Sequence, residues 1–374
     1  MIETFVSGAP EIALTAPTGM TLRQPTTVWF KALDGHWLNF KRLPPVASVV
    51  AGGVARGPVT LVHGTGVRAN LFCPPTAMTL PAMLAAEGFD VWMLNWRSSI
   101  DLRPIEWDLD DAAVLDFPAA VKVVRQATGC ESLKAIIHCQ GSCSFLMALV
   151  SGKLGPFSTV ISNSSALHPL VPFMARVKLP IAVETFGRLA KWFNPQYGLH
   201  PPRIVPKIMN WMVRAFHHEC NNAVCKYASF VYGVGFPTMW NHDNLNDETH
   251  EWLKGEFGHA PAKLFKQVRR CVGEGRLVST RAYDADKVPE DRRLPREFAV
   301  EAPKTEATFH FITGAENRCF KPEAIEKTWS FLDRVDPGRN HTTRRFAGYG
   351  HMDVFIGKNA SRDVFPYIID RLRE

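Results

Sequence analysis

The chain has 374 residues, of which 46% are hydrophobic and 21% charged, so it has the composition of a globular protein with a large core. Its net charge of +7 is spread over scattered pairs such as Arg269-Arg270 and Arg344-Arg345. Without a basic stripe or a nucleic-acid motif, we expect no nucleic-acid binding. The eight cysteines lack the spacing of a disulfide framework, and no signal peptide or apolar run of roughly 20 residues is apparent. These features predict a cytoplasmic protein with reduced thiols.

The first part of the chain, residues 1–162, alternates short β-rich runs with helical stretches. Asp34-Gly35 predicts a hairpin turn between the runs Val28–Lys31 and Trp37–Arg42. Further strands are expected at 59–62, 90–95, 134–138 and 158–161, and helices at 74–87 and 116–127. Strands that are regularly interrupted by helices predict an α/β fold with a mostly parallel sheet and helices on both faces.

The remainder of the chain divides into two further parts. Residues 163–300 are rich in helical patterns, aromatic residues and prolines, with few strand signals. Residues 301–374 return to the sheet pattern, with strands expected at 308–312 and 341–346 and helices at 322–335 and 361–373. We therefore predict a core formed by residues 1–162 and 301–374, and a helical cap or lid formed by residues 163–300.

The segment from Ile136 to Ser142 combines the end of a strand with the start of a helix. A nucleophile held on such a sharp turn needs small neighbours, and Gly141 follows Cys139 by two positions, although Ile137 stands where a glycine is usual. The start of a helix favours an anion, which predicts a lowered thiol pKa for Cys139. A buried structural cysteine is the alternative. Ser142 is a competing nucleophile, but it would already lie within the helix.

Three further segments could complete an active site. The turn at His63-Gly64 suggests that the main-chain amides of Thr65 and Gln140 form an oxyanion hole, unless the turn is purely structural. His351, between glycines after the last predicted strand, suits a general base. A residue that orients the histidine is expected after the penultimate strand, where Asn317 occupies the usual aspartate position and Glu316 lies beside it. We favour Asn317, because a Cys-His pair functions with asparagine in known proteases.

No metal or cofactor is expected. The group His217, His218, Cys220 and Cys225 fits no standard zinc spacing. Gly233-Val234-Gly235 lacks the remainder of a dinucleotide-binding motif and does not follow an early strand, so no flavin site is predicted.

Taken together, these segments resemble the α/β-hydrolase superfamily, and more closely the hydrolase-like proteins associated with GMC-type (cholesterol-oxidase-like) oxidoreductases. A more distant similarity is to polyhydroxyalkanoate synthases, which also set a cysteine in a lipase-like box and carry a Trp-Arg segment like Trp96-Arg97, but whose orienting residue is aspartate. The resemblance implies an α/β-hydrolase fold with a large cap, and substrate-binding roles for Trp96, Trp240 and His242. The segments that carry it are Val91–Ser99, His138–Ser142, Trp240–Leu245 and Gly348–Asp353.

The predicted function is hydrolysis of an ester, thioester or lactone of a small hydrophobic, lipid- or steroid-like substrate through an acyl-enzyme on Cys139. Two alternatives stay open, namely an acyltransferase of the polyhydroxyalkanoate-synthase type and a non-catalytic partner module of a GMC-type oxidoreductase. The substrate's identity and the formation of a homo-oligomer also stay open.

Overall fold

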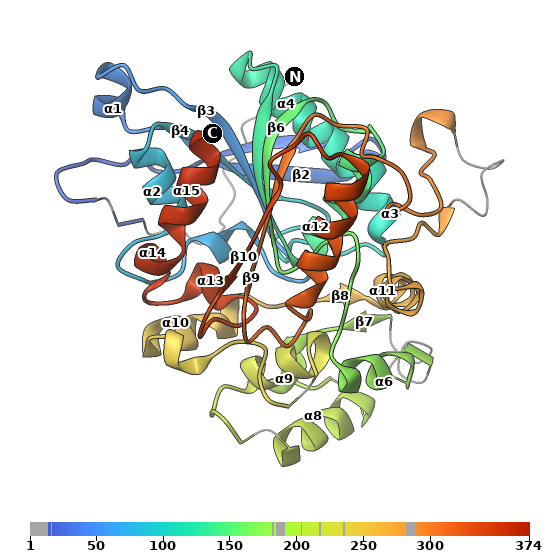
Figure 1. The fold of residues 1–374 in the computed structure, drawn as a ribbon. Helices are drawn as coiled ribbons and strands as arrows, with labels where there is room; N and C mark the ends of the chain where they lie inside the picture. Colours follow the sequence, from blue (N-terminus) through green and yellow to red (C-terminus); the bar gives the residue numbers. More distant parts are fainter. Residues whose placement is uncertain are drawn as a thin grey trace.

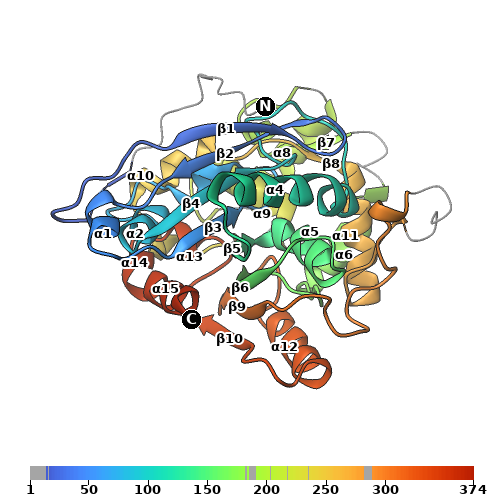
Figure 2. The same ribbon diagram turned by 90° about the horizontal axis from the view of Figure 1, so that it is seen from above.

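A twisted eight-stranded sheet forms the centre of the molecule (Figures 1 and 2). The computed structural model describes residues 14–15, 17–181, 183–184, 191–202, 204–216, 218–234, 236–281 and 289–374. The strand order is β1-β2-β4-β3-β5-β6-β9-β10; β1, β2 and β4 pair antiparallel, and the neighbours from β4 to β10 pair parallel. The strands are β1 Thr26–Lys31, β2 Trp37–Leu43, β3 Gly57–Val62, β4 Phe89–Asn95, β5 Leu133–His138, β6 Phe157–Asn163, β9 Thr308–Gly314 and β10 Thr342–Phe346.

Helices cover both faces of this sheet, as the sequence predicts, and each face has its own apolar core (Figure 2). On one face lie α4, α5 and α12, whose Phe117, Phe145 and Phe331 pack in one cluster. On the other face lie α2 and α15, where Leu84 and Ile368 pack in a second cluster. The helices are α1 Ala47–Ala51, α2 Leu80–Ala86, α3 Leu109–Asp111, α4 Phe117–Thr128, α5 Cys139–Val150, α12 Glu323–Val335, α13 Asp353–Ile356, α14 Ala360–Asp363 and α15 Phe365–Arg373.

Two predicted helices differ from those observed. The helix expected from residue 74 begins only at Leu80, where the Thr79 side chain accepts a hydrogen bond from the Ala82 N–H and caps the first turn. The helix expected over 361–373 is divided into α14 and α15. Pro366 lies in the first turn of α15 and has no N–H to continue a helix from α14.

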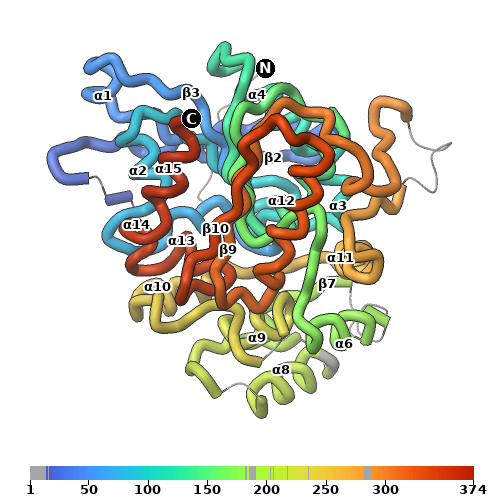
Figure 3. Tube along the Cα trace, in the orientation of Figure 1, coloured from blue at the N-terminus to red at the C-terminus, as the bar shows by residue number. Residues whose placement is uncertain are grey.

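The chain leaves the sheet after β6, forms a layer of helices beyond the carboxyl ends of the parallel strands, and returns at β9 (Figures 1 and 3). These helices come from the stretch predicted as a cap, but α11 also belongs to the core, because its Leu264 and Val268 pack in the cluster of α4 and α5. Among the described residues, no helix has both the length and the apolar character of a membrane span. The elements are α6 Phe173–Ile181, α8 Ile204–Phe216, α9 Ala223–Tyr232, η5 His242–Asn244, α10 Asp247–Trp252, α11 Ala262–Glu274 and the two-residue strands β7 Trp192–Phe193 and β8 Ala260–Pro261.

Candidate active site

Cys139 occupies a strained turn at the point where β5 ends and α5 begins. Its φ of 55° is in the left-handed region, which residues other than glycine rarely adopt. The turn closes tightly: a Cβ added at Gly141 would lie 2.2 Å from the His63 carbonyl oxygen, and one at Gly64 would lie 2.9 Å from the Cys139 Cβ. Ile137, at the position where a glycine is usual, is fully buried in β5 and pairs with Val62. The elbow therefore forms without a glycine at that position.

Two histidines lie close to the Cys139 sulfur. Sγ and one ring nitrogen of each of His138 and His351 lie within 4.8 Å of one another. Nδ1 of His138 accepts a hydrogen bond from the Asn163 amide at 2.9 Å, which places the ring proton on Nε2. His138 therefore has no free nitrogen with which to take a proton from Cys139. Ser142, the competing nucleophile, is fully buried within α5.

Asn317 holds His351 in the opposite tautomer. Its Oδ1 accepts hydrogen bonds from the main-chain N–H groups of Cys319 and Phe320 and lies 3.2 Å from His351 Nδ1. Since Oδ1 only accepts, Nδ1 of His351 carries the proton and Nε2 is free to act as a base. Glu316 has an exposed side chain, so the structure places Asn317 rather than Glu316 against the histidine.

The loop that carries His351 is held by hydrogen bonds to the cap and to the buried carboxylate of Asp353. The His351 N–H donates to the Met239 carbonyl at 2.9 Å. Both oxygens of Asp353 accept from the Gly350 N–H, and one of them also accepts from the Asn244 side-chain amide at 2.7 Å. These bonds fix the position of His351 relative to the cap segment that contains Met239 and Asn244. The sequence motif around His351 gives no sign of these contacts.

The protonation of Cys139 differs from the prediction of a lowered pKa. A hydrogen bond with the Cys319 thiol, together with burial, raises the pKa of Cys139 well above its ordinary value of 9.0, and this outweighs the lowering effect of His351. The start of α5 does not overcome these two effects, because the thiol is only 7% exposed. Cys139 is therefore a neutral thiol at neutral pH, and attack on a substrate requires a base to remove its proton.

We expect the ultraviolet absorbance of a thiolate at Cys139 to be absent near neutral pH. The measurement is the difference spectrum between the wild-type protein and Cys139→Ser, titrated from about pH 6 to about pH 10. Because the thiol pKa is raised, the difference should emerge only above pH 9.0. A thiolate signal that is already complete near pH 6 would show a preformed thiolate–imidazolium pair and contradict this assignment.

The predicted oxyanion-hole residues, Thr65 and Gln140, lie on two different segments beside Cys139. Gln140 is in the first turn of α5, where main-chain N–H groups have no acceptor within the helix, and Thr65 follows the turn at Gly64. A third group was not anticipated from the sequence. The Tyr232 hydroxyl is buried without a hydrogen-bond partner among the described residues, and a Cβ added at Gly66 would lie 2.3 Å from it. Burial, with Cys139 and Cys319 nearby, raises the pKa of this hydroxyl.

The three residues predicted to bind substrate have different surroundings. Trp96 is fully buried in the core, where its Nε1 donates to the His63 carbonyl at 3.0 Å, so it supports the turn beneath the site. Trp240 is also buried and stacks on Phe257, a residue that lines the cavity beside Cys139. His242 is directed toward Cys225, whose sulfur lies 3.4 Å from its Nε2. Of the three, Trp240 is the residue that packs against a side chain lining the cavity beside Cys139.

Two cavities lie near the site, and Tyr232 stands between them. The cavity beside Cys139 and His351 has about 20 Å³, which is room for about one water molecule. A second cavity of about 290 Å³ lies between α6, α8, α9 and α11 and has an almost wholly apolar lining. Tyr232 lines the small cavity, and its ring stacks on Phe265, which lines the large one. The cavity beside Cys139 is therefore too small for an acyl chain, and the stacked rings of Tyr232 and Phe265 connect its wall with that of the larger cavity.

The chain is 32% identical to lipase lipl-3 of Caenorhabditis elegans, over 90% of its own length and 86% of that protein. The chain belongs to the lipase family. It is also 26% identical to lipase member K of Homo sapiens, over 91% of its own length and 86% of that protein. No family model matches the chain. The predicted resemblance to GMC-associated proteins and polyhydroxyalkanoate synthases stays a prediction.

Solved structures confirm the predicted α/β-hydrolase fold of this lipase-family chain. An esterase of Thermogutta terrifontis matches it with a TM-score of 0.52 and 15% identity, over 94% of this chain and 98% of that one. An α/β-hydrolase fold protein of Burkholderia ambifaria matches with a TM-score of 0.50 and 13% identity, over 94% and 99%. At these identities the likeness concerns the fold alone.

Proposed function

We propose that the chain hydrolyses esters of hydrophobic acyl groups, including lipid esters, through an acyl-enzyme on Cys139. The observation that carries this proposal is the strained turn that holds Sγ of Cys139 within 4.8 Å of a ring nitrogen of His351, whose Nδ1 faces Asn317. A nucleophile, a base and a group that orients the base, arranged in this order, are the requirements of acyl transfer.

The reaction begins with a neutral thiol. As Sγ attacks the carbonyl carbon of the ester, Nε2 of His351 takes the thiol proton, and the carbonyl oxygen becomes an oxyanion. The main-chain amides of Thr65 and Gln140 are the proposed donors to that oxyanion, with the Tyr232 hydroxyl as a further donor. His351 then protonates the leaving alcohol, and a thioester remains on Cys139. Water, deprotonated by His351, attacks the thioester and releases the carboxylic acid and the thiol.

The cap favours a hydrophobic acyl chain. The cavity of about 290 Å³ has the size and apolar lining of a ligand pocket, and it lies beyond Tyr232 from the nucleophile. On the outside of the same layer, large apolar side chains of α6 and α8 are exposed, with Phe173 and Ile204 at 75% and Trp211 at 70%. Exposed apolar groups gathered on adjacent helices are typical of surfaces that contact lipid or another protein. The relatives named as lipases agree with such a substrate.

The proposal is tested by intact-mass analysis after mixing the protein with p-nitrophenyl and glycerol esters of increasing chain length. We expect the wild type to gain the mass of one acyl group transiently, with peptide mapping that places it on Cys139, and to release free acid into water. The matched control is Cys143→Ser, which removes another buried thiol one turn further along α5 and should leave the adduct in place.

Each other result selects against the proposal. Product release that depends on an added alcohol or thiol would indicate an acyltransferase. No adduct with any ester or thioester, together with co-purification of an oxidoreductase, would indicate a non-catalytic partner module.

A further inference from the structure

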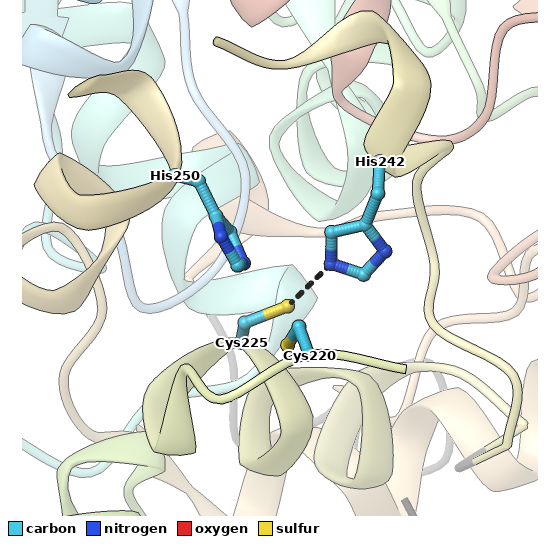
Figure 4. A group of neighbouring side chains, drawn as sticks. All are labelled: Cys220, Cys225, His242 and His250. Carbon is cyan, nitrogen blue, oxygen red and sulfur yellow. Dashed lines mark hydrogen bonds between the residues drawn. The ribbon is translucent and has the colours of Figure 1, made fainter. Parts of the chain in front are cut away.

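Two cysteines and two histidines of the cap converge at a point separate from Cys139. The ligand-capable atoms of Cys220, Cys225, His242 and His250 all lie within 4.8 Å of one another. Figure 4 shows both imidazole rings directed toward the two sulfur atoms. We propose that these four side chains bind one zinc ion, which holds α9, η5 and α10 together.

The spacing within the cluster agrees with tetrahedral coordination. Zinc binds sulfur at about 2.3 Å and imidazole nitrogen at about 2.0–2.1 Å, so the ligand atoms of a tetrahedral site lie roughly 3.3–3.8 Å apart. Sγ of Cys225 and Nε2 of His242 are 3.4 Å apart. The ring centroids of His242 and His250 are 4.9 Å apart and nearly perpendicular, at 82°, so both rings can present a nitrogen to one point. Two thiolates with two imidazoles are a ligand set typical of zinc.

The neighbours of the cluster orient its histidines as second-shell partners of a metal do. The Thr238 hydroxyl donates to the Trp240 carbonyl at 3.2 Å and lies 3.4 Å from Nδ1 of His242. Because the hydroxyl hydrogen points to the carbonyl, the hydroxyl oxygen accepts a hydrogen bond from Nδ1–H of His242. Nε2 of His242 is then unprotonated and faces Cys225. Nε2 of His250 is buried and forms no hydrogen bond within the described part of the chain. A buried ring nitrogen without a hydrogen-bond partner is a second observation that points to a metal ligand.

Asn222 connects the segment that carries the two cysteines with the helix α10, which carries His250. Its Oδ1 accepts from the N–H groups of Val224 and Cys225 and caps α9, while its side-chain amide donates to the His250 carbonyl at 2.5 Å. Cys225 therefore lies in the first turn of α9, at a position that the Asn222 cap fixes. Four protein ligands leave no open position, so the site is structural rather than catalytic.

The same cap segment contacts the loop of His351. Asn241 and Asn244 donate to the Gly348 carbonyl at 2.9 and 2.7 Å, and these residues flank or belong to η5, which carries His242. Zinc would therefore stabilise the segment that braces the proposed base. This site was not predicted from the sequence, where the two cysteines were considered together with the neighbouring His217 and His218. His217 lies outside the described residues, and the His218 side chain is exposed.

The first experiment measures metal in the tag-free, full-length protein. We expect about one zinc per chain by mass spectrometry of the metal. After removal of the zinc with a chelator, addition of Co²⁺ should produce the intense visible bands of tetrahedral cobalt, together with sulfur-to-cobalt charge-transfer absorption. X-ray absorption should show two sulfur and two nitrogen neighbours. These readouts do not depend on enzymatic activity.

Variants then locate the metal. Cys220→Ser and His250→Ala should lose zinc and the tetrahedral cobalt spectrum. Cys130→Ser is the matched control, since Cys130 is partly exposed like Cys220 but follows α4 in the core, and it should retain both. A chelator should lower the midpoint of thermal unfolding of the wild type and of Cys130→Ser, and leave that of Cys220→Ser unchanged.

Any one of three results would overturn the proposal. The first is a wild-type protein that contains no zinc and gives no tetrahedral cobalt spectrum. The second is retention of zinc by Cys220→Ser and His250→Ala, and the third is a Cys220–Cys225 disulfide in the protein purified under mild conditions.

Discussion

Cys139→Ala is expected to lower kcat/KM for ester hydrolysis by about 10⁴-fold or more. Alanine removes the only atom that forms the acyl-enzyme and leaves the remainder of the site in place. The backbone at this position is already in the left-handed region, with a φ of 55°, and alanine has the same backbone preferences as cysteine there. The loss should therefore be one of kcat, without loss of the fold.

Circular dichroism and thermal unfolding provide the control for this variant, because both should match the wild type closely. Cys143→Ala serves as a second control, since Cys143 is equally buried and its sulfur lies 2.8 Å from the Ser165 hydroxyl, away from the proposed chemistry. Full activity in Cys139→Ala would show that the nucleophile lies elsewhere in the chain.

Asn317→Asp is expected to rescue Cys139→Ser by about 10²-fold or more in kcat. Both a thiol and a hydroxyl pass their proton to His351, but serine is the weaker acid, so its attack depends more on stabilisation of the imidazolium, which asparagine does not provide. An aspartate at position 317 would place a carboxylate 3.2 Å from Nδ1 of His351. It would keep the two hydrogen bonds from the N–H groups of Cys319 and Phe320, and could accept another from Thr313, whose hydroxyl now accepts from Asn317.

The two backgrounds make this prediction specific. With Cys139 present, Asn317→Asp should change kcat by less than about tenfold, because a thiol is a stronger acid than a hydroxyl and passes its proton to His351 more readily. Steady-state kinetics of the four proteins, with one soluble ester, give the coupling between positions 139 and 317. A double variant no more active than Cys139→Ser alone would mean that Asn317 does not act through His351.

Local sequence was sufficient for the features that depend on neighbouring residues. The strands β3, β4, β5 and β6 follow from short, mostly apolar runs, because a parallel strand covered on both faces is rich in apolar residues. The elbow at Cys139 follows from a strand that ends next to small residues, and the glycine at 141 has no room for a side chain. The order of the proposed nucleophile, orienting residue and histidine is read directly from the sequence.

Tertiary structure alone decided the features that depend on side chains distant in the chain. Asn317 and Glu316 are adjacent in sequence, and only the packing of the loop buries one and exposes the other. The raised pKa of Cys139 depends on burial and on the Cys319 thiol, 180 positions away. His242 and His250 join Cys220 and Cys225 because three separate cap elements fold together. The burial of a side chain and its distance from residues far along the chain arise from the packing of the whole chain. The spacing of residues within a short segment therefore does not predict either.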